Sequence, residues 1–133
     1  SAVLSSNRLS KESIERGDHF LSMNGREVFR HAVKRFPETI NESLEFNGLT
    51  SKDIDLLVPH QANLRISDMI QKKMGLPDNK IFNNIKKYGN TTAASIPICL
   101  SEAKKEGRIN NNDLVVCAAF GAGFLWGSAV IKW

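Results

Sequence analysis

The chain has 133 residues and a mass of 14.8 kDa, the size of one domain or of half of a larger enzyme. With 41% hydrophobic and 24% charged residues, it has the composition of a globular protein, which excludes disordered, collagen-like and low-complexity classes. No apolar run approaches the roughly 20 residues that cross a bilayer, and no signal segment is recognisable. We therefore expect a cytoplasmic protein with no membrane partner.

The net charge of +4 is concentrated in one window of the sequence. Residues 60–90 hold two acidic and six basic residues, so this window alone carries +4, while the rest of the chain balances. Such a basic region indicates an anionic partner, either nucleic acid, a phosphorylated cofactor or an acidic carrier protein. A solvated helix face without a partner is the alternative. The basic residues are Arg65, Lys72, Lys73, Lys80, Lys86 and Lys87.

In the first two thirds of the chain, apolar periodicity predicts two helices and one strand. Apolar residues recur every three or four positions through residues 26–47, which indicates an amphipathic helix. Pro37 removes a backbone donor there and should kink this helix or split it in two. Residues 54–58 form a buried strand that Pro59 ends, and residues 61–75 form a second helix.

The C-terminal part begins with a polar segment, residues 77–87, which we interpret as irregular. A helix rich in small residues follows over residues 91–106. Residues 114–120 and 124–133 are apolar and of strand length, and the Gly121-Ala122-Gly123 turn between them predicts a β-hairpin. The order of elements indicates an α/β domain in which helices cover a mixed sheet.

Three polar features lie at the ends of these elements, where α/β folds place their ligand sites. His60 follows the first strand, Asn90 precedes a helix, and the glycine turn exposes backbone N–H groups that can bind an oxyanion. Each also has a structural alternative, namely a structural histidine, a helix N-cap and a plain hairpin turn. No CxxC pair or HExxH motif occurs, so we expect no metal site.

Three segments carry a resemblance to a known family: 58–66 (VPHQANLRI), 88–97 (YGNTTAASIP) and 119–129 (AFGAGFLWGSA). In this order they resemble the C-terminal half of β-ketoacyl-acyl-carrier-protein synthase III, the enzyme that starts bacterial fatty-acid synthesis. A fourth match is residues 23–30 (MNGREVFR). The resemblance divides the chain into a linker or residual N-terminal segment, residues 1–19, and a condensing-enzyme domain, residues 20–133.

The resemblance implies a thiolase-like fold, in which two similar α/β halves pack into a layered αβαβα structure, and an enzyme that is a homodimer. It also implies a decarboxylative Claisen condensation. A cysteine takes an acyl group from acyl-CoA, and malonyl-acyl carrier protein then loses carbon dioxide and attacks that thioester. Apart from CoA and phosphopantetheine thioesters as substrates, no cofactor is implied.

Residue by residue, the resemblance gives His60 and Asn90 the catalytic roles and the Ala122 amide an oxyanion role, although the family usually has glycine there. Neither Cys99 nor Cys117 matches the nucleophile. We expect both cysteines to be inert core residues and the nucleophile to lie in a missing N-terminal half, which leaves this fragment inactive alone.

Two further sets of residues match positions outside the catalytic centre. The carrier-protein docking face matches Arg30, Arg65, Lys72 and Lys73. The CoA and pantetheine channel matches Gly25, Phe29, Ala62, Asn63 and Ile66. Nucleic acid would suit the charge, but no recognition motif supports it. Two alternatives remain beside fatty-acid initiation: a related condensing enzyme of secondary metabolism, and an inactive carrier-protein-binding fragment.

Overall fold

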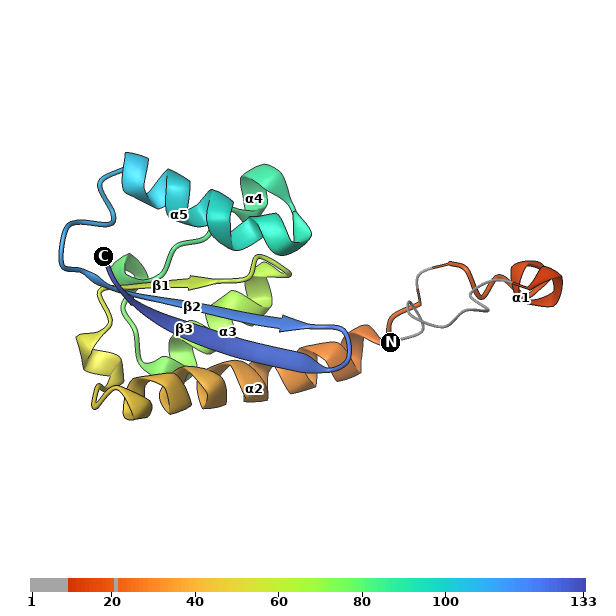
Figure 1. Cartoon of the computed structure of the whole chain (residues 1–133), viewed down its shortest axis with the longest axis horizontal. Helices are drawn as coiled ribbons and strands as arrows, with labels where there is room; N and C mark the ends of the chain where they lie inside the picture. The colour runs from red at the N-terminus through yellow and green to blue at the C-terminus, as the bar shows by residue number, and fades with distance from the viewer. Residues whose placement is uncertain (1–9, 21) are drawn as a thin grey trace.

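A three-stranded mixed sheet forms the middle layer of the domain (Figure 1). The computed structural model describes residues 10–20 and 22–133. Strand β1 (Leu56–Pro59) pairs in parallel with β2 (Leu114–Gly121), which pairs antiparallel with β3 (Leu125–Lys132). The order is β1-β2-β3, and the last two strands form the expected hairpin. This topology confirms an α/β domain with a mixed sheet.

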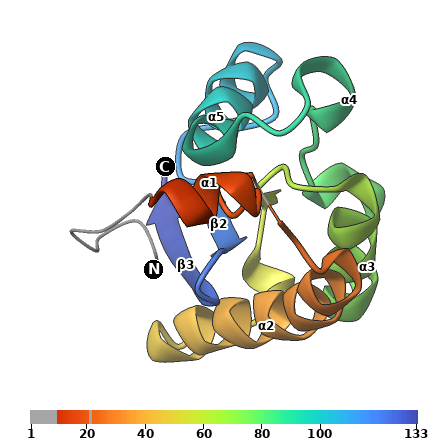
Figure 2. The same cartoon turned by 90° about the vertical axis from the view of Figure 1, so that its right-hand side faces the viewer.

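Helices cover both faces of the sheet (Figures 1 and 2). Helices α2 (Gly25–Phe46) and α3 (Leu64–Met74) lie on one face, and α4 (Ile85–Tyr88) and α5 (Ser95–Lys105) lie on the other. Helix α1 (Lys11–Glu15) lies apart from this body in Figure 1. It belongs to the segment 1–19 interpreted as a linker, whose residues 1–9 lie outside the described part. Single 3-10 turns occupy Ser51–Asp53 (η2), Asp78–Lys80 (η3) and Thr92–Ala94 (η4).

Alternation along the strands divides the core into two apolar clusters. Leu57 and Val116 face α2 and α3, whereas Leu56, Val58 and Val115 pack in the cluster that contains α5 residues. Successive strand residues point to opposite faces, so a sheet covered on both sides needs apolar residues at nearly every position. The burial of every residue of β1 follows from this arrangement.

Helix α2 runs without a break through Pro37, so the expectation that proline splits it is wrong. The helix begins where the Asn24 side chain accepts a hydrogen bond from the Glu27 N–H at 3.3 Å. Proline inside a helix costs about 3 kcal/mol. Phe36, Ile40 and Leu44 are each at most 1% exposed, and burying such side chains contributes about 1.5–3 kcal/mol apiece. Packing on both sides of the proline therefore outweighs the lost backbone bond.

Side-chain capping and strand pairing explain other differences from the sequence-based boundaries. Helix α3 begins at Leu64 rather than residue 61, because the Asn63 side chain accepts the Arg65 N–H at 2.9 Å. Pro59 is the last paired residue of β1, opposite Ala118, rather than the residue beyond its end. Helix α5 starts at Ser95, four residues later than expected, after the turn η4.

The segment expected to be irregular, residues 77–87, also contains regular structure. Ile81 forms a parallel bridge with Leu57, and the Phe82 N–H donates to the Leu57 carbonyl at 2.9 Å. Both apolar side chains are buried, and helix α4 begins at Ile85. The chain therefore runs beside β1 before it enters α4.

We predict that Ile40→Ala destabilises the protein by about 2–5 kcal/mol, because it removes a fully buried side chain that the surrounding core cannot fully replace. Chemical denaturation of the full-length protein measures this loss as a lower unfolding midpoint. The neighbouring Asn41 is exposed, so Asn41→Ala is the control and should change stability by less than about 0.5 kcal/mol. Equal effects of both changes would contradict the packing of α2 on the sheet.

Candidate active site

The parallel pairing of β1 with β2 brings two predicted site residues to one edge of the sheet. His60 directly follows β1, and its backbone N–H donates to the Ala118 carbonyl at 2.8 Å. Ala122 directly follows β2 and begins the hairpin turn. The carboxyl ends of parallel strands share one edge, which is where α/β sheets place their sites.

Asn90 reaches this edge from the layer of helices α4 and α5, because it lies just beyond the end of α4. Gly89 follows α4 with a φ of +68°, a conformation that favours glycine and turns the chain away from the helix. The Asn90 Oδ1 accepts the Thr92 N–H at 2.9 Å. The N-cap of the 3-10 turn η4 is Thr91, so Asn90 is not the N-cap that the structural alternative proposed, and its hydrogen bond is a local turn contact. Because Oδ1 is engaged by a donor, the Nδ2 protons remain as the donors that Asn90 can offer to a ligand.

One cavity of about 860 Å³ brings His60, Asn90 and Ala122 together. Its walls come from the start of α2, the start of α3 and the β2–β3 hairpin, and most of its other lining side chains are apolar. Among the residues matched to a pantetheine channel, Ala62 and Ile66 line this cavity, while Gly25, Phe29 and Asn63 are not among its lining residues. The apolar lining includes Val28, Phe36, Phe120, Phe124, Leu125 and Trp126.

The His60 imidazole is half-buried, and burial lowers its pKa below the usual 6.5 because the imidazolium loses hydration. The ring is therefore neutral near pH 7. Its Nδ1 lies 2.6 Å from the Ser95 Oγ at the start of α5. A neutral imidazole held in this way can present one N–H or one lone pair to a ligand, depending on its tautomer.

The side chain of Gln61, which sequence reasoning missed, joins two segments beside the site: the end of β1 and the stretch that enters α4. Gln61 is 2% exposed. Its Nε2 donates to the Pro59 carbonyl at 2.8 Å and to the Asn83 Oδ1 at 3.3 Å. Its Oε1 accepts the N–H groups of Asn84 at 3.0 Å and Ile85 at 3.1 Å. The one available signal was a glutamine directly after the strand-end histidine.

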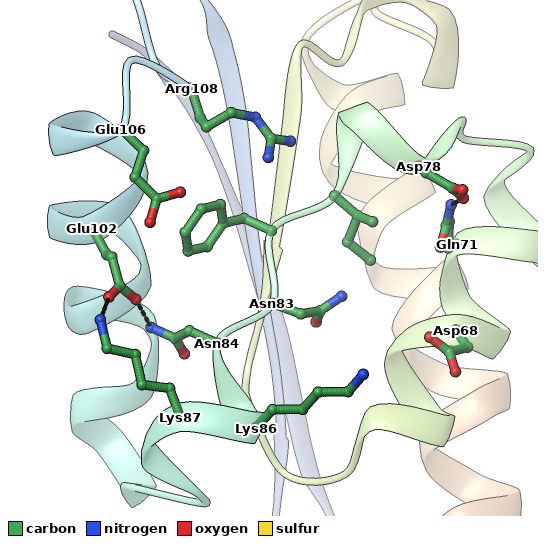
Figure 3. A pocket seen from close by; sticks show the side chains of 12 residues that line it. Asp68, Gln71, Asp78, Asn83, Asn84, Lys86, Lys87, Glu102, Glu106 and Arg108 are labelled. Carbon is green, nitrogen blue, oxygen red and sulfur yellow. Dashed lines mark hydrogen bonds and ion pairs between the residues drawn. The ribbon is translucent and has the colours of Figure 1, made fainter.

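A second, polar cavity of about 590 Å³ lies beside α4 and α5, and its charged groups tie these helices together (Figure 3). The Glu102 carboxylate accepts hydrogen bonds from Lys87, from Asn84 Nδ2 at 2.9 Å and from Tyr88 at 3.0 Å. The Lys87 ammonium and the Asn84 amide lower the pKa of Glu102 to about 2. These bonds fix the path of α4 toward Asn90.

The four basic residues matched to a docking face are exposed on α2 and α3. The Arg65 guanidinium lies 5.4 Å from the centre of the Phe29 ring, while Arg30 forms an ion pair with Glu27 at 2.6 Å. Lys72 and Lys73 occupy the last turn of α3. Lys72 lies seven positions after Arg65, so these two residues are about 10 Å apart along the helix.

Both cysteines are buried in the cluster under α5, as expected. Burial raises the pKa of each thiol to about 11, so the reactive thiolate is scarce at neutral pH. Among residues 10–20 and 22–133, no group of three or more His, Cys, Asp or Glu residues is arranged to hold a metal ion. No helix within these described ranges is long and apolar enough to cross a membrane.

With this geometry in view, comparison with known proteins identifies the family. Residues 44–133 match the family described as 3-Oxoacyl-[acyl-carrier-protein (ACP)] synthase III C terminal. The chain belongs to this family. Its similarity to β-ketoacyl-[acyl-carrier-protein] synthase III of Symbiobacterium thermophilum is 50% identity over 124 residues, which cover 93% of the chain and 38% of that relative.

Solved structures agree with this membership. The synthase III of Thermus thermophilus superposes with a TM-score of 0.83 at 49% identity, covering 84% of this chain and 35% of that one. The priming β-ketosynthase of the R1128 polyketide pathway superposes with a TM-score of 0.78 at 30% identity, and the match covers 91% of this chain and 38% of that one. The fold is thiolase-like, and the chain spans about two fifths of the length of the relatives that it matches.

We predict that His60 destabilises the folded protein in mild acid. The unfolded imidazole takes up a proton near pH 6.5, whereas the folded one resists until the pH reaches its lowered pKa. The free energy of unfolding should therefore fall as the pH drops from 6.5 to that pKa, and the loss should be complete below it. Denaturation at a series of pH values measures this contribution.

The control for this prediction is His60→Gln, which has no titratable group at the same position. The difference in stability between the two proteins should vary over this pH window and be constant above it. A difference that does not change with pH would contradict the lowered pKa of His60.

Proposed function

We propose that this chain forms the C-terminal catalytic half of a β-ketoacyl-acyl-carrier-protein synthase III in the initiation of fatty-acid synthesis. The observation that carries this proposal is the meeting of His60, Asn90 and Ala122 in one largely apolar cavity. These residues come from three separate segments, and all three segments carry the family resemblance. The reaction is the condensation of an acyl-CoA with malonyl-acyl carrier protein.

The neutral donors of the site suit the decarboxylation step. When the bond between the malonyl α-carbon and its carboxylate breaks, carbon dioxide leaves and the electron pair moves toward the thioester oxygen as an enolate. An imidazole N–H of His60 and the Nδ2 protons of Asn90 donate to that oxygen and stabilise its negative charge. The low pKa of His60 suits this role, since a neutral ring stabilises the charge without taking it up as a proton.

The second half of the reaction needs a group that the two cysteines do not supply. The α-carbon attacks the carbonyl carbon of an acyl-cysteine. The carbonyl oxygen would accept a hydrogen bond from the Ala122 N–H, and the cysteine then leaves as a thiolate. Cys99 and Cys117 are buried under α5 with raised pKa values, so we assign the nucleophile to an N-terminal half. We further infer a homodimeric, cytoplasmic enzyme that uses thioester substrates without a resident cofactor.

The basic side chains outside the cavity suit an acidic carrier protein. Arg30 and Arg65 lie near the start of α2 and α3, whose first turns also supply walls of the cavity. Positive charge beside these walls would steer an acidic partner and hold its phosphopantetheine arm near the site. We propose Arg30, Arg65, Lys72 and Lys73 as the docking residues and Phe29 as support for the Arg65 guanidinium.

A priming enzyme of secondary metabolism is the second candidate, favoured by the similarity to the polyketide priming β-ketosynthase. Its chemistry at His60 and Asn90 would be the same, and the acyl group accepted would differ. A third possibility is a carrier-protein-binding piece without chemistry of its own. A cysteine-bearing half encoded immediately upstream would favour an enzyme, and its absence would favour that third possibility.

We predict that His60→Ala or Asn90→Ala in the full-length protein slows malonyl decarboxylation about 100- to 1,000-fold, the usual effect of removing one oxyanion donor. Acylation of the nucleophilic cysteine should persist, because neither side chain serves that step. Release of labelled carbon dioxide and the intact mass of the acyl-enzyme measure the two steps separately. The control is Asn111→Ala in an exposed turn. Normal decarboxylation in both site variants would overturn the proposed roles.

We predict that Arg65→Glu raises the KM for malonyl-acyl carrier protein more than the KM for acyl-CoA. The difference should be larger at low salt, where charge attraction is least screened. The matched control is Lys105→Glu, which makes the same charge change on an exposed residue of α5 in the opposite layer. If each variant changes the KM values for malonyl-acyl carrier protein and acyl-CoA equally, the proposed docking role of Arg65 is wrong.

A further inference from the structure

We propose that Ser95 is a positioning residue that fixes the His60 tautomer with its proton on Nε2. This inference rests on the proposed function, since that tautomer is the one that can donate to an enolate oxygen while Nδ1 is held by the protein. Ser95 does not line the cavity and would touch no substrate. It acts on the reaction only through the imidazole of His60.

The geometry around the Ser95 hydroxyl carries the proposal. Ser95 is 1% exposed and is the first residue of α5. Its Oγ lies 2.6 Å from His60 Nδ1, well within hydrogen-bonding distance. The same Oγ accepts the backbone N–H of Gln61 at 3.3 Å. One serine oxygen therefore contacts both residues that follow β1.

The donors and acceptors around the Ser95 hydroxyl select one tautomer of His60. A hydroxyl has one proton to donate and two lone pairs. Among the residues that the structure describes, the Ser95 hydroxyl has two hydrogen-bond partners, and the Gln61 N–H can only donate. A proton on Nδ1 would make both partners donors and leave the buried hydroxyl proton without an acceptor, at a cost of about 1–3 kcal/mol. The hydroxyl therefore donates to Nδ1, and the neutral ring carries its proton on Nε2.

The opposite tautomer would reverse the electrostatics of the proposed site. Nδ1 faces Ser95, so Nε2 is the nitrogen left for a ligand. Without its proton, Nε2 would offer a lone pair to the enolate oxygen and repel it. The hydroxyl also favours the neutral ring and so lowers the pKa of His60, as burial does. A hydrogen bond to the Nδ1 lone pair exists only while that nitrogen is unprotonated.

Selective ¹⁵N labelling of histidine in the full-length protein tests the tautomer directly, because protonated and lone-pair ring nitrogens resonate far apart. His60→Gln assigns the signals. We expect a lone-pair Nδ1 and a protonated Nε2 in the wild type near pH 7. A protonated Nδ1 would overturn the proposal, and this measurement needs no variant of Ser95 that folds.

Variants of Ser95 test its effect on the site. Ser95→Ala should give a mixture of tautomers, raise the pKa of His60 and slow malonyl decarboxylation about ten-fold, the effect of one neutral hydrogen bond. Ser95→Thr keeps the hydroxyl and should restore the single tautomer. Ser101→Ala, on the exposed side of α5, is the control. An unchanged tautomer and pKa in Ser95→Ala would overturn the positioning role.

The two proposals fail separately in these experiments. If the wild-type tautomer is as proposed but His60→Ala decarboxylates normally, the function assigned to His60 is wrong and the tautomer assignment stands. If decarboxylation needs His60 while Nδ1 carries the proton, the function stands and the role of Ser95 is wrong.

Discussion

The interaction on which the site most depends is the set of hydrogen bonds made by the buried Gln61 amide. Both amide protons and the oxygen are used, and they join the end of β1 to the segment that enters α4. A buried polar group left without a partner costs about 1–3 kcal/mol. Any displacement of α4 relative to β1 would break several of these bonds together. The amide therefore restricts the two segments that lead to His60 and Asn90 to one relative arrangement.

Around this junction, the protein separates neutral groups from charged ones. The cavity of His60, Asn90 and Ala122 is lined mainly by apolar side chains, while the four basic residues proposed for docking lie on the exposed surfaces of α2 and α3. Apolar walls lower the local dielectric constant, which strengthens a hydrogen bond made beside them. Exposed charges act over a longer range and are sensitive to salt. In the proposed reaction, the first group would stabilise a transient anion and the second would gather its carrier.

Local patterns predicted the parts of the fold that local forces determine. The spacing of Phe36, Ile40 and Leu44 predicted the buried face of α2, and the glycine turn predicted the hairpin. The rule that sites gather at strand ends singled out His60 and the turn at Ala122. The clustering of basic residues marked Arg65, Lys72 and Lys73 as a surface for an anionic partner. Arg30 and the channel residues came only from the resemblance, because exposed or isolated residues have no periodicity that marks them.

Contacts between distant segments were beyond reach of the same patterns. Gln61 and Asn84 are 23 positions apart, and His60 and Ser95 are 35 apart. Each of these residues is unremarkable within its own stretch of sequence. The sequence left open whether Pro37 kinks or splits α2 for the same reason, since the packing that keeps the helix continuous comes from the sheet rather than from the helix.

The burial of Cys99 and Cys117 has a practical consequence for studying the whole protein. With both pKa values near 11 and both side chains in the core, these thiols react slowly with alkylating reagents at neutral pH. A reagent that modifies the folded protein quickly would therefore report on a sulfur outside this domain. Thiol reagents should thus leave this domain unmodified. A fluorophore or an affinity tag could therefore be attached to a reactive cysteine elsewhere without altering this region.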